Sequence, residues 1–441
     1  MDRAVALTDI VVFLECFRQC FTAPGYYYFQ QFVRTFWLGD ERRTVTAVYR
    51  QARGGKHFSN FHRFLKTYRW SPAAVTLTLV RTVLARLGLG PDPAGVCWVN
   101  VALDDTLTRK WGRKMEGASW QHDPMSPAPK GKKPPLAFGH CWVVLGLLWP
   151  HGSRWLFLAW GAWLFRPPKI TPQAEQETKL ALTVRRLREW KLPSWLRLRV
   201  VCDGAYGKRT LVDGLRALGH HVISRLPSNA VLYEFPTPPT EKRRGRPRKY
   251  GEKRPVAHFA ALAAAAPVRT LRLYGRDWSV RLAAFSLLSR SLGGREIRLV
   301  IVLREGVRGS KPTFLFTTDL TLSPEQVVEL YAARFAIELA FRDLKNHFGL
   351  GHYQARRAVA AERHVTLCLV AYTWSQLLLL SGRYGPLGEP WRKAPPLVTT
   401  GQLRYQVRKE QQVRNFLAIC ERHQIPAKKR AAMVAELALA T

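Results

Sequence analysis

Four polar side chains suited to phosphate chemistry share one narrow face of a helix-like segment around Glu338. With a helical step of about 100°, Tyr331, Arg334 and Lys345 all lie within about 40° of Glu338. The remaining positions of the segment are mostly apolar: Val327, Val328, Leu330, Phe335, Ile337, Leu339, Phe341 and Leu344. A carboxylate, two cations and a phenol on an otherwise buried helix need a partner outside that helix.

This polar face has two interpretations. It is either an internal stripe of ion pairs, which contributes little beyond local order, or a site for an external ligand. Arg334 and Lys345 would bind phosphate oxygens as charge-assisted donors, and Tyr331 would add a hydrogen bond. The second interpretation therefore predicts a nucleic-acid contact on this face.

Two upstream segments end in aspartate at the end of an expected β-strand. Val96–Leu103 is rich in β-branched and aromatic residues and leads into Asp104 and Asp105. Leu196–Cys202 leads into Asp203, which is followed by glycines that allow a sharp turn. An aspartate after a strand is more often an ordinary turn residue. The order Asp, Asp, Glu in strand, strand and helix is much harder to obtain by chance.

Three carboxylates in this order suit metal-assisted cleavage of phosphodiesters. In-line attack uses one metal ion to activate the attacking oxygen and a second to stabilise the leaving oxygen. Mg²⁺ takes hard oxygen ligands from a few carboxylates and completes its shell with water and substrate phosphate. The chemistry therefore needs acidic residues, and it needs neither cysteine nor histidine.

The spacing of Tyr331, Arg334, Glu338 and Lys345 resembles the signature of bacterial DDE transposases of the insertion-sequence-4 superfamily, which includes the Tn-five type. This resemblance implies a DNA transposase that cuts at transposon ends and joins the freed 3′-hydroxyl to target DNA. It implies double-stranded DNA as the substrate, Mg²⁺ as the cofactor with Mn²⁺ as a substitute, and a homodimer in the synaptic complex. The terminus of the transposon would be held by Tyr331, Arg334 and Lys345.

The resemblance leaves the first catalytic acid open between two neighbours. The Asp-Thr dipeptide of Tn-five-like relatives favours Asp105, so the expected metal ligands are Asp105, Asp203 and Glu338. Asp104 is the alternative, because other DDE enzymes have an Asp followed by an acid and a small polar residue. A central strand is buried on both faces, so its residues do not alternate between polar and apolar. The strand pattern therefore does not show which of the two aspartates faces the site. The following Thr106, Lys110 and Gly112 resemble the insertion-sequence-701 branch.

The composition agrees with a nucleic-acid substrate. Lys and Arg number 69 against 31 Asp and Glu, a formal net charge of +38, and the pI is near 10.7. Such a chain binds polyphosphates at low salt. With 441 residues and 47% hydrophobic content it also has enough apolar material for several packed domains, which excludes a simple charged tail.

The cysteines and the apolar segments predict a cytoplasmic, nucleoid-associated protein. Seven scattered cysteines without a Cys-x-x-Cys pair do not suggest a disulfide framework. The amino terminus lacks a basic and then hydrophobic leader. The apolar run Val365–Leu380 contains Thr, Tyr, Ser and Gln and is short for a membrane span, so we expect a core helix there.

The expected fold is α/β, with an RNase H-like core interrupted by a β-strand insertion domain and flanked by helical regions. We expect five regions in this order: a helical DNA-binding domain over 1–92, the first part of the core over 93–230, the insertion over 231–311, the second part of the core with the catalytic helix over 312–381, and a helical region over 382–441.

Particular features support these boundaries. Basic and aromatic residues interleave in 1–92, which favours DNA binding over a simple cap on the core. Thr171 and Pro172 predict the start of a helix that continues to Trp190. The carboxy-terminal helices could dimerise or contact DNA.

The inserted segment carries a strand pattern and a basic loop. Four runs predict strands, at Arg269–Tyr274, Trp278–Phe285, Ile297–Leu303 and Thr313–Thr318, and the last of them returns to the core. Before them, the arginines Arg244, Arg246 and Arg248 stand around Gly and Pro, a pattern similar to an AT-hook that inserts into a narrow A·T minor groove. The alternative is a solvated basic loop.

Three functions are consistent with these patterns. An active DDE transposase accounts for the three acids and for the Tyr-Arg-Glu-Lys helix together. A non-catalytic DNA-binding protein derived from a transposase is the alternative. An RNA-directed nuclease of the same fold is weaker, because nothing in the chain resembles an RNA-binding module.

Overall fold

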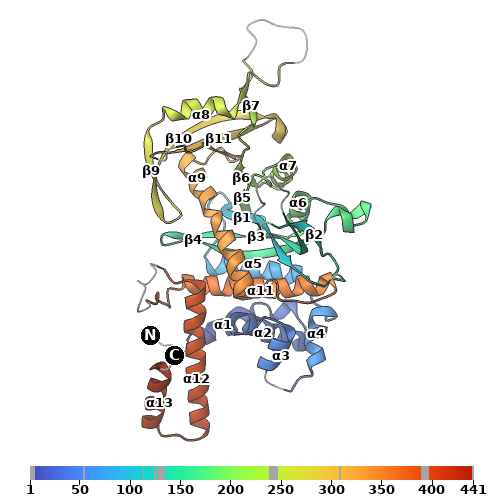
Figure 1. Ribbon diagram of the computed structural model, residues 1–441, viewed down its shortest axis with the longest axis vertical. Coiled ribbons are helices and arrows are strands. Elements are labelled where there is room, and N and C mark those ends of the chain that lie inside the picture. The colour runs from blue at the N-terminus through green and yellow to red at the C-terminus, as the bar shows by residue number, and fades with distance from the viewer. Residues whose placement is uncertain are drawn as a thin grey trace.

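The computed structural model describes residues 5–52, 55–112, 114–123, 126, 135–237, 247–306, 309–388 and 397–439. Figure 1 shows an elongated molecule with a mixed sheet in its middle, the first five helices below the sheet, and strands β9, β10 and β11 with helix α8 above it. The long helix α11 lies between the sheet and the helices α2 and α4, whereas α5 contacts β4 of the sheet directly.

The amino-terminal region is helical, as expected. Its helices are α1 (Val5–Glu15), α2 (Ala23–Leu38), α3 (Val45–Gln51), α4 (Phe58–Lys66) and α5 (Pro72–Arg86), with a short 3₁₀ turn at Arg18–Cys20. Thr22, Thr44 and Ser71 cap α2, α3 and α5 by accepting a hydrogen bond from a backbone amide of the first turn. The helices α2, α4 and α5 pack against α11.

The core strands have an order consistent with an RNase H-like fold. They are β1 (Cys97–Arg109), β2 (Ser119–His122), β3 (Leu136–His151), β4 (Arg154–Phe165), β5 (Leu196–Cys202) and β6 (His221–Arg225). The spatial order is β4, β3, β1, β5, β6, with β3 antiparallel to both β4 and β1, and β5 parallel to both β1 and β6. The helix α7 (Arg209–Ala217) connects β5 to β6.

The three strands expected in the inserted segment and the fourth, expected to return to the core, are present, and their ends differ from the prediction by a few residues at most. They are β9 (Val268–Leu273), β10 (Arg276–Ser289), β11 (Arg295–Arg304) and β12 (Thr313–Thr317). β12 pairs with β6 of the core, so these strands extend the core sheet. The short strands β7 (Val231–Tyr233) and β8 (Lys253–Pro255), the helix α8 (Val256–Ala264) and a 3₁₀ turn at Arg290–Leu292 complete this part.

The helix expected around Glu338 is divided into two. Ser323 caps α9 (Pro324–Ala333) with a capping box, and α10 (Phe335–Asn346) follows after Arg334. Arg334 has helical φ and ψ of −49° and −33°, so the two helices continue in nearly the same course. The third helix, α11 (Ala358–Leu380), is buried along most of its length, and α12 (Thr400–Arg422) and α13 (Ala427–Leu439) end the described chain.

The helix predicted from Thr171 to Trp190 begins later than expected. Thr171 donates its hydroxyl to the carbonyls of Arg166 and Pro167, and the chain passes through 3₁₀ turns at Pro168–Ile170 and Gln173–Glu175. The helix α6 (Lys179–Glu189) starts only after Thr178, whose side chain accepts from the amide of Ala181. Thr178 is therefore the N-cap, because it is the threonine that satisfies a first-turn amide.

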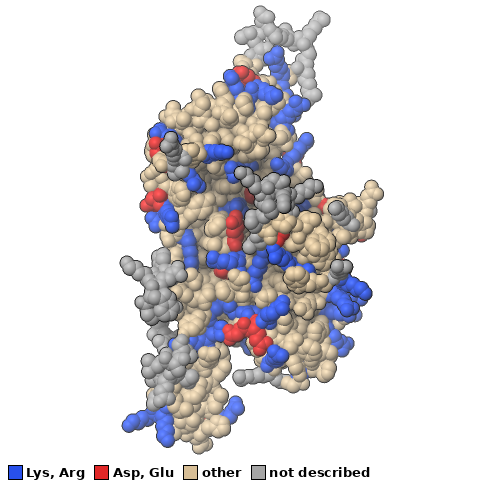
Figure 2. Space-filling view, viewed as in Figure 1, with Lys and Arg blue, Asp and Glu red and all other residues tan. Residues whose placement is uncertain are grey.

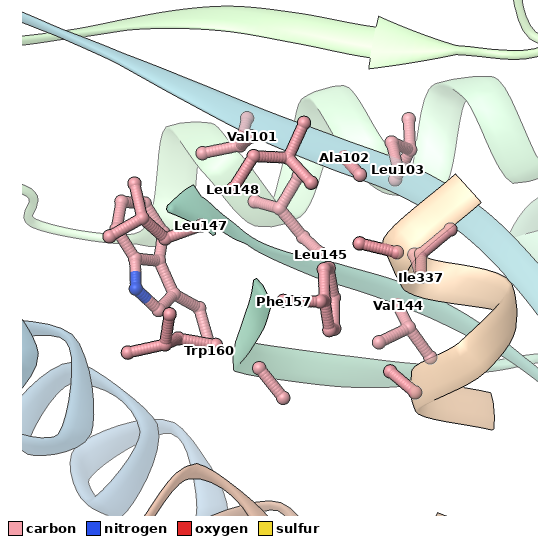
Figure 3. Close-up of a cluster of buried hydrophobic side chains, with 14 of the residues drawn as sticks. Val101, Ala102, Leu103, Val144, Leu145, Leu147, Leu148, Phe157, Trp160 and Ile337 are labelled. Atoms are coloured by element: carbon pink, nitrogen blue, oxygen red, sulfur yellow. The ribbon is translucent and has the colours of Figure 1, made fainter. Parts of the chain in front are cut away.

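One continuous hydrophobic cluster joins the first helices, the sheet and α9 to α11. Figure 3 shows its centre, where Ile337 of α10 lies among core side chains that include Val144 of β3. In α11, Arg363 donates to the backbone carbonyls of Leu65, Tyr68 and Trp70 and so ties the first helices to the core. No helix in the described ranges is long and apolar enough to span a membrane.

Candidate active site

The register of three parallel strands brings Asp104, Asp203 and Arg225 to one face of the sheet. Leu103 of β1 pairs with Cys202 of β5, so the next residues, Asp104 and Asp203, stand opposite each other. Val201 of β5 pairs with Ile223 of β6, which places Arg225 in register with Asp203. Because laterally paired residues project to the same side of a sheet, these three side chains share a face.

Helices α9 and α10 bring a cation and a third carboxylate to the same face. The guanidinium of Arg334 donates from Nη1 to Oδ2 of Asp104 at 2.9 Å and from Nη2 to Oε1 of Glu338 at 2.6 Å. The side chains of Arg334 and Asp104 are 15% and 20% exposed, and that of Glu338 is 43% exposed. Glu338 thus forms the solvent-facing edge of a largely buried acidic group.

Burial dominates the electrostatics of Asp104. It raises the pKa of Asp104 to about 6, while Arg334 and the amide of Asp105 act in the opposite direction. The negative charges of Asp105 and Asp203 raise the pKa further. Asp104 and Asp203 therefore sit close enough to repel each other, and a cation between or beside them is favourable.

The turn after β5 holds Asp203 in place. Oδ1 of Asp203 accepts from the amides of Ala205 at 2.8 Å and Tyr206 at 3.3 Å, and its carbonyl accepts from the Ser224 hydroxyl at 2.7 Å. A Cβ at Gly207 would stand 2.5 Å from the Ser224 hydroxyl oxygen, so this close turn requires glycine.

The phenol of Tyr331 belongs to the same neighbourhood. Burial raises the pKa of Tyr331, and the charged groups that act on it are Arg334, Arg225 and Asp203. The guanidinium carbon of Arg334 lies 6.0 Å from the centroid of the Tyr331 ring. Three of the four residues of the sequence signature, Tyr331, Arg334 and Glu338, thus meet the acidic strand ends.

Asp105 lies on the opposite face of the sheet. Its Oδ2 accepts from Lys179 Nζ at 2.6 Å and from the Cys141 thiol at 3.3 Å. Its Oδ1 accepts from the Tyr206 hydroxyl at 2.7 Å. Successive residues of a strand point to opposite sides, so Asp104 and Asp105 cannot both face Glu338.

The sequence comparison agrees with this geometry. The model of the DDE superfamily endonuclease family matches residues 16–282, which is more than half of the chain. The chain belongs to the DDE superfamily endonuclease family. No curated protein matches it. The matched segment contains both Asp104 and Asp203 and ends before Glu338.

DDE endonucleases generally use divalent metal ions, and the acids of this member suit such an ion in type. Asp104, Asp203 and Glu338 offer the hard oxygen donors that Mg²⁺ prefers. Among the described residues, however, no three carboxylates or other ligand side chains are close enough to hold one ion together. In this structure the positive charge between Asp104 and Glu338 is the guanidinium of Arg334.

Two groups of predicted DNA-binding residues lie apart from the acidic group of this family member. Lys345 is near the other end of α10, where burial lowers its pKa and the charges acting on it are those of Asp123 and Arg109. Arg248 is exposed beside β8. Arg244 and Arg246 are outside the described residues, so the AT-hook-like loop stays a prediction.

Sequence reasoning missed three residues of this region. Arg225 is a charged residue at the end of β6, beside the strand that leads into Asp203. A charged residue at a strand end is visible in the sequence, so this residue could have been predicted. Lys179 and Tyr206 contact Asp105 from segments 74 and 101 residues away. Sequence spacing holds no signal for such contacts, because only the packing of α6 and of the turn after β5 creates them.

Proposed function

We propose that this DDE endonuclease is a DNA transposase that cuts at transposon ends and joins the 3′-hydroxyl to target DNA. The observation that carries the proposal is that Asp104 and Asp203 stand in register on one face of the sheet, with Arg334 linking Asp104 to Glu338. The signature of the insertion-sequence-4 superfamily supports the same function.

In this proposal Asp104, Asp203 and Glu338 hold the divalent cations, Mg²⁺ or Mn²⁺. The bound ions would supply activation of the attacking oxygen and stabilisation of the leaving oxygen. Arg334, already within hydrogen-bond distance of two of the acids, would bind the phosphate of the DNA end beside them. Tyr331 and Arg225 extend that contact along the same face, and Lys345 would bind a more distant phosphate.

The proposal assigns the first catalytic acid to Asp104 instead of Asp105. Asp104 shares a face with Asp203 and contacts the Arg334–Glu338 pair, whereas the carboxylate of Asp105 receives hydrogen bonds from Lys179, Tyr206 and Cys141 on the other face. Asp105 therefore lies away from Asp203 and Glu338, the other two acids that this proposal needs. This reverses the preference drawn from the Asp-Thr dipeptide.

A non-catalytic DNA-binding protein derived from a transposase remains the second candidate. The observation in its favour is that Arg334 pairs with both Asp104 and Glu338, and that the acids do not form a group of three within ligand distance in the described chain. In that case the four residues are the internal ion-pair stripe of the alternative interpretation, and the DNA contacts lie elsewhere.

Strand cleavage separates the two candidates. The substrate is a labelled duplex that carries the short inverted repeats read from the DNA flanking the coding region, incubated with Mg²⁺ or Mn²⁺. We expect wild-type protein to nick and join it, and Asp203→Ala or Glu338→Ala to abolish both steps while DNA binding is retained or becomes tighter. Losing a negative charge beside phosphate cannot weaken binding electrostatically.

The matched control is Glu329→Ala, which removes an acid from α9 that has no side-chain hydrogen bond within the described residues. It should cut like wild type. Metal-dependent cutting by Asp203→Ala or Glu338→Ala would refute the catalytic assignment. DNA binding without cutting by the wild-type protein, on the same repeats and with either metal, would favour the non-catalytic candidate.

A further inference from the structure

A cleft with cations along its lining is present between the first helices and the segment that follows α10. It has a volume of about 420 Å³. One wall comes from α3, its N-cap and α4, and the other from the segment between α10 and α11 together with the start of α11. Its lining residues are Thr44, Val45, Thr46, His62, Leu65, Lys66, His352, Tyr353, Gln354, Ala355, Arg356, Arg357, Ala360 and His364.

The two walls are held together by buried contacts. The amide of Arg43 donates to Nδ1 of His352 at 2.9 Å. Gly349 has φ +78°, and a Cβ there would lie 2.4 Å from the Cβ of Arg43. The two segments of the chain therefore approach too closely for any residue other than glycine. Lys110 Nζ donates to the carbonyls of Gly351 and Tyr353 at 2.8 and 2.7 Å. The cleft is therefore built before any ligand arrives.

The charged side chains that line the cleft are all cations, apart from its neutral histidines. Lys66, Arg356 and Arg357 line it with exposed side chains, and its lining contains no acidic residue. Within the described chain these three cations form no side-chain hydrogen bond or ion pair with an acid. A group of unpaired cations in a preformed cleft attracts an anion without first breaking internal contacts.

The histidines of the cleft add hydrogen-bonding groups but no charge at neutral pH. Burial, with Arg42, Arg43 and Lys110 adding to it, lowers the pKa of His352 to about 4. Burial also lowers the pKa of His62. The three long cationic side chains, together with the hydroxyls of Thr44 and Thr46, are thus the groups that would meet a phosphate.

We propose that this cleft binds a backbone phosphate of the DNA on which the protein acts, at a site separate from the acidic group. The proposal rests on the proposed function only in that the ligand is DNA. The segment Gly349–Arg357 directly follows α10, so a phosphate held here joins the first helices to the end of the catalytic helix. This gives the amino-terminal region a specific DNA contact, where the sequence indicated only a basic and aromatic character.

The test compares two triple variants that lose the same charge. The first is Lys66→Gln, Arg356→Gln and Arg357→Gln. The control is Arg188→Gln, Lys191→Gln and Arg216→Gln, three exposed cations in and near α6 and α7 without side-chain hydrogen bonds to described residues. Binding to a fluorescent mixed-sequence duplex is measured by anisotropy over a series of salt concentrations, with EDTA present so that cutting does not interfere.

We expect the cleft variant to lower the slope of log K against log salt by about one unit, the value for one lost phosphate contact, while the control keeps the wild-type slope. Equal slopes for the two triple variants would overturn the proposal. Because the assay contains no metal, its result does not depend on whether the protein cuts DNA.

A second measurement separates DNA from a free anion. The unfolding temperature of the wild-type protein is followed as inorganic phosphate is added, and the cleft variant is followed in parallel. We expect the two proteins to respond alike, because a single free phosphate gains little from so open a site. A rise that the cleft variant lacks, with unchanged DNA slopes, would make the cleft a small-anion site and refute the DNA contact.

Discussion

The two faces of the sheet at β1 give neighbouring aspartates different surroundings. On one face Asp104 has Arg334 as its side-chain donor, with Asp203 beside it and the half-exposed Glu338 at the solvent edge. On the other face Asp105 accepts from an ammonium, a phenol and a thiol. The first arrangement concentrates negative charge next to solvent, and the second neutralises one carboxylate inside a closed network.

The face that carries Asp105, here called the closed face, also supports the face that carries Asp104. Tyr206 donates its hydroxyl to Asp105, and its amide donates to Oδ1 of Asp203. The turn that carries Asp203 is thereby fastened to the strand that carries Asp104. The comparison teaches that one acid of the pair faces the proposed active site, while the other accepts a hydrogen bond from the turn that carries Asp203.

The largest effect should come from exchanging the two neighbouring acids for amides. Asp104→Asn should reduce strand cleavage to background, because it removes a charge from the acidic face. Asp105→Asn should cost only about 10- to 100-fold, the range for residues that position a ligand-bearing segment. Rates of nicking on the flanking-repeat duplex measure both. A dead Asp105→Asn protein beside an active Asp104→Asn protein would reverse the assignment.

The next effect is on stability and belongs to the closed face. Lys179→Met leaves the largely buried Asp105 without its cation, and we expect the free energy of unfolding to fall by about 2 kcal/mol. The double variant Lys179→Met and Asp105→Asn should recover part of that loss, because no unpaired charge remains. Urea unfolding of the two single variants and the double variant gives the coupling energy. A coupling near zero would mean that the pair does not stabilise the fold.

A smaller change should separate positioning from packing. Tyr206→Phe keeps the ring but removes the hydrogen bond to Asp105, at a cost of about 1 kcal/mol in stability. If this bond positions Asp203, the concentration of Mg²⁺ that gives half-maximal cutting rises about tenfold, while cutting at saturating Mg²⁺ recovers. A stability loss with an unchanged Mg²⁺ dependence would show a merely structural contact.

The smallest expected changes concern the cations of the signature. Arg334→Ala should lower the salt slope of end binding by about one unit, and Lys345→Ala should do the same through a separate phosphate. Retention of the cleaved end in gel shifts measures the same contacts. If Arg334→Ala instead lowers stability and leaves the slope unchanged, its hydrogen bonds to Asp104 and Glu338 are the internal ion pairs of the alternative interpretation.

The sequence was sufficient for the local elements because their signals are local. Apolar runs before Asp104 and Asp203, the helical spacing around Glu338 and the strand pattern of 269–318 all correspond to elements of the structure. The start of α6 was misplaced because two threonines both suit an N-cap, and only the amide of Ala181 shows which one is used. The division between α9 and α10 at Arg334 also has no local signal.

By itself, the sequence determined which acids and cations exist, and that they end strands or share a helix face, since these properties depend on neighbours in the chain. Tertiary structure decided which of two adjacent aspartates meets Glu338. A strand buried on both faces shows no alternation of polar and apolar residues in its sequence. The directions of its side chains follow only from the pairing of β1 with β5. It also decided that Lys66 lies across a cleft from Arg356. Those placements depend on how elements that are distant in the sequence pack together, and the spacing of residues along the chain carries no signal for that packing.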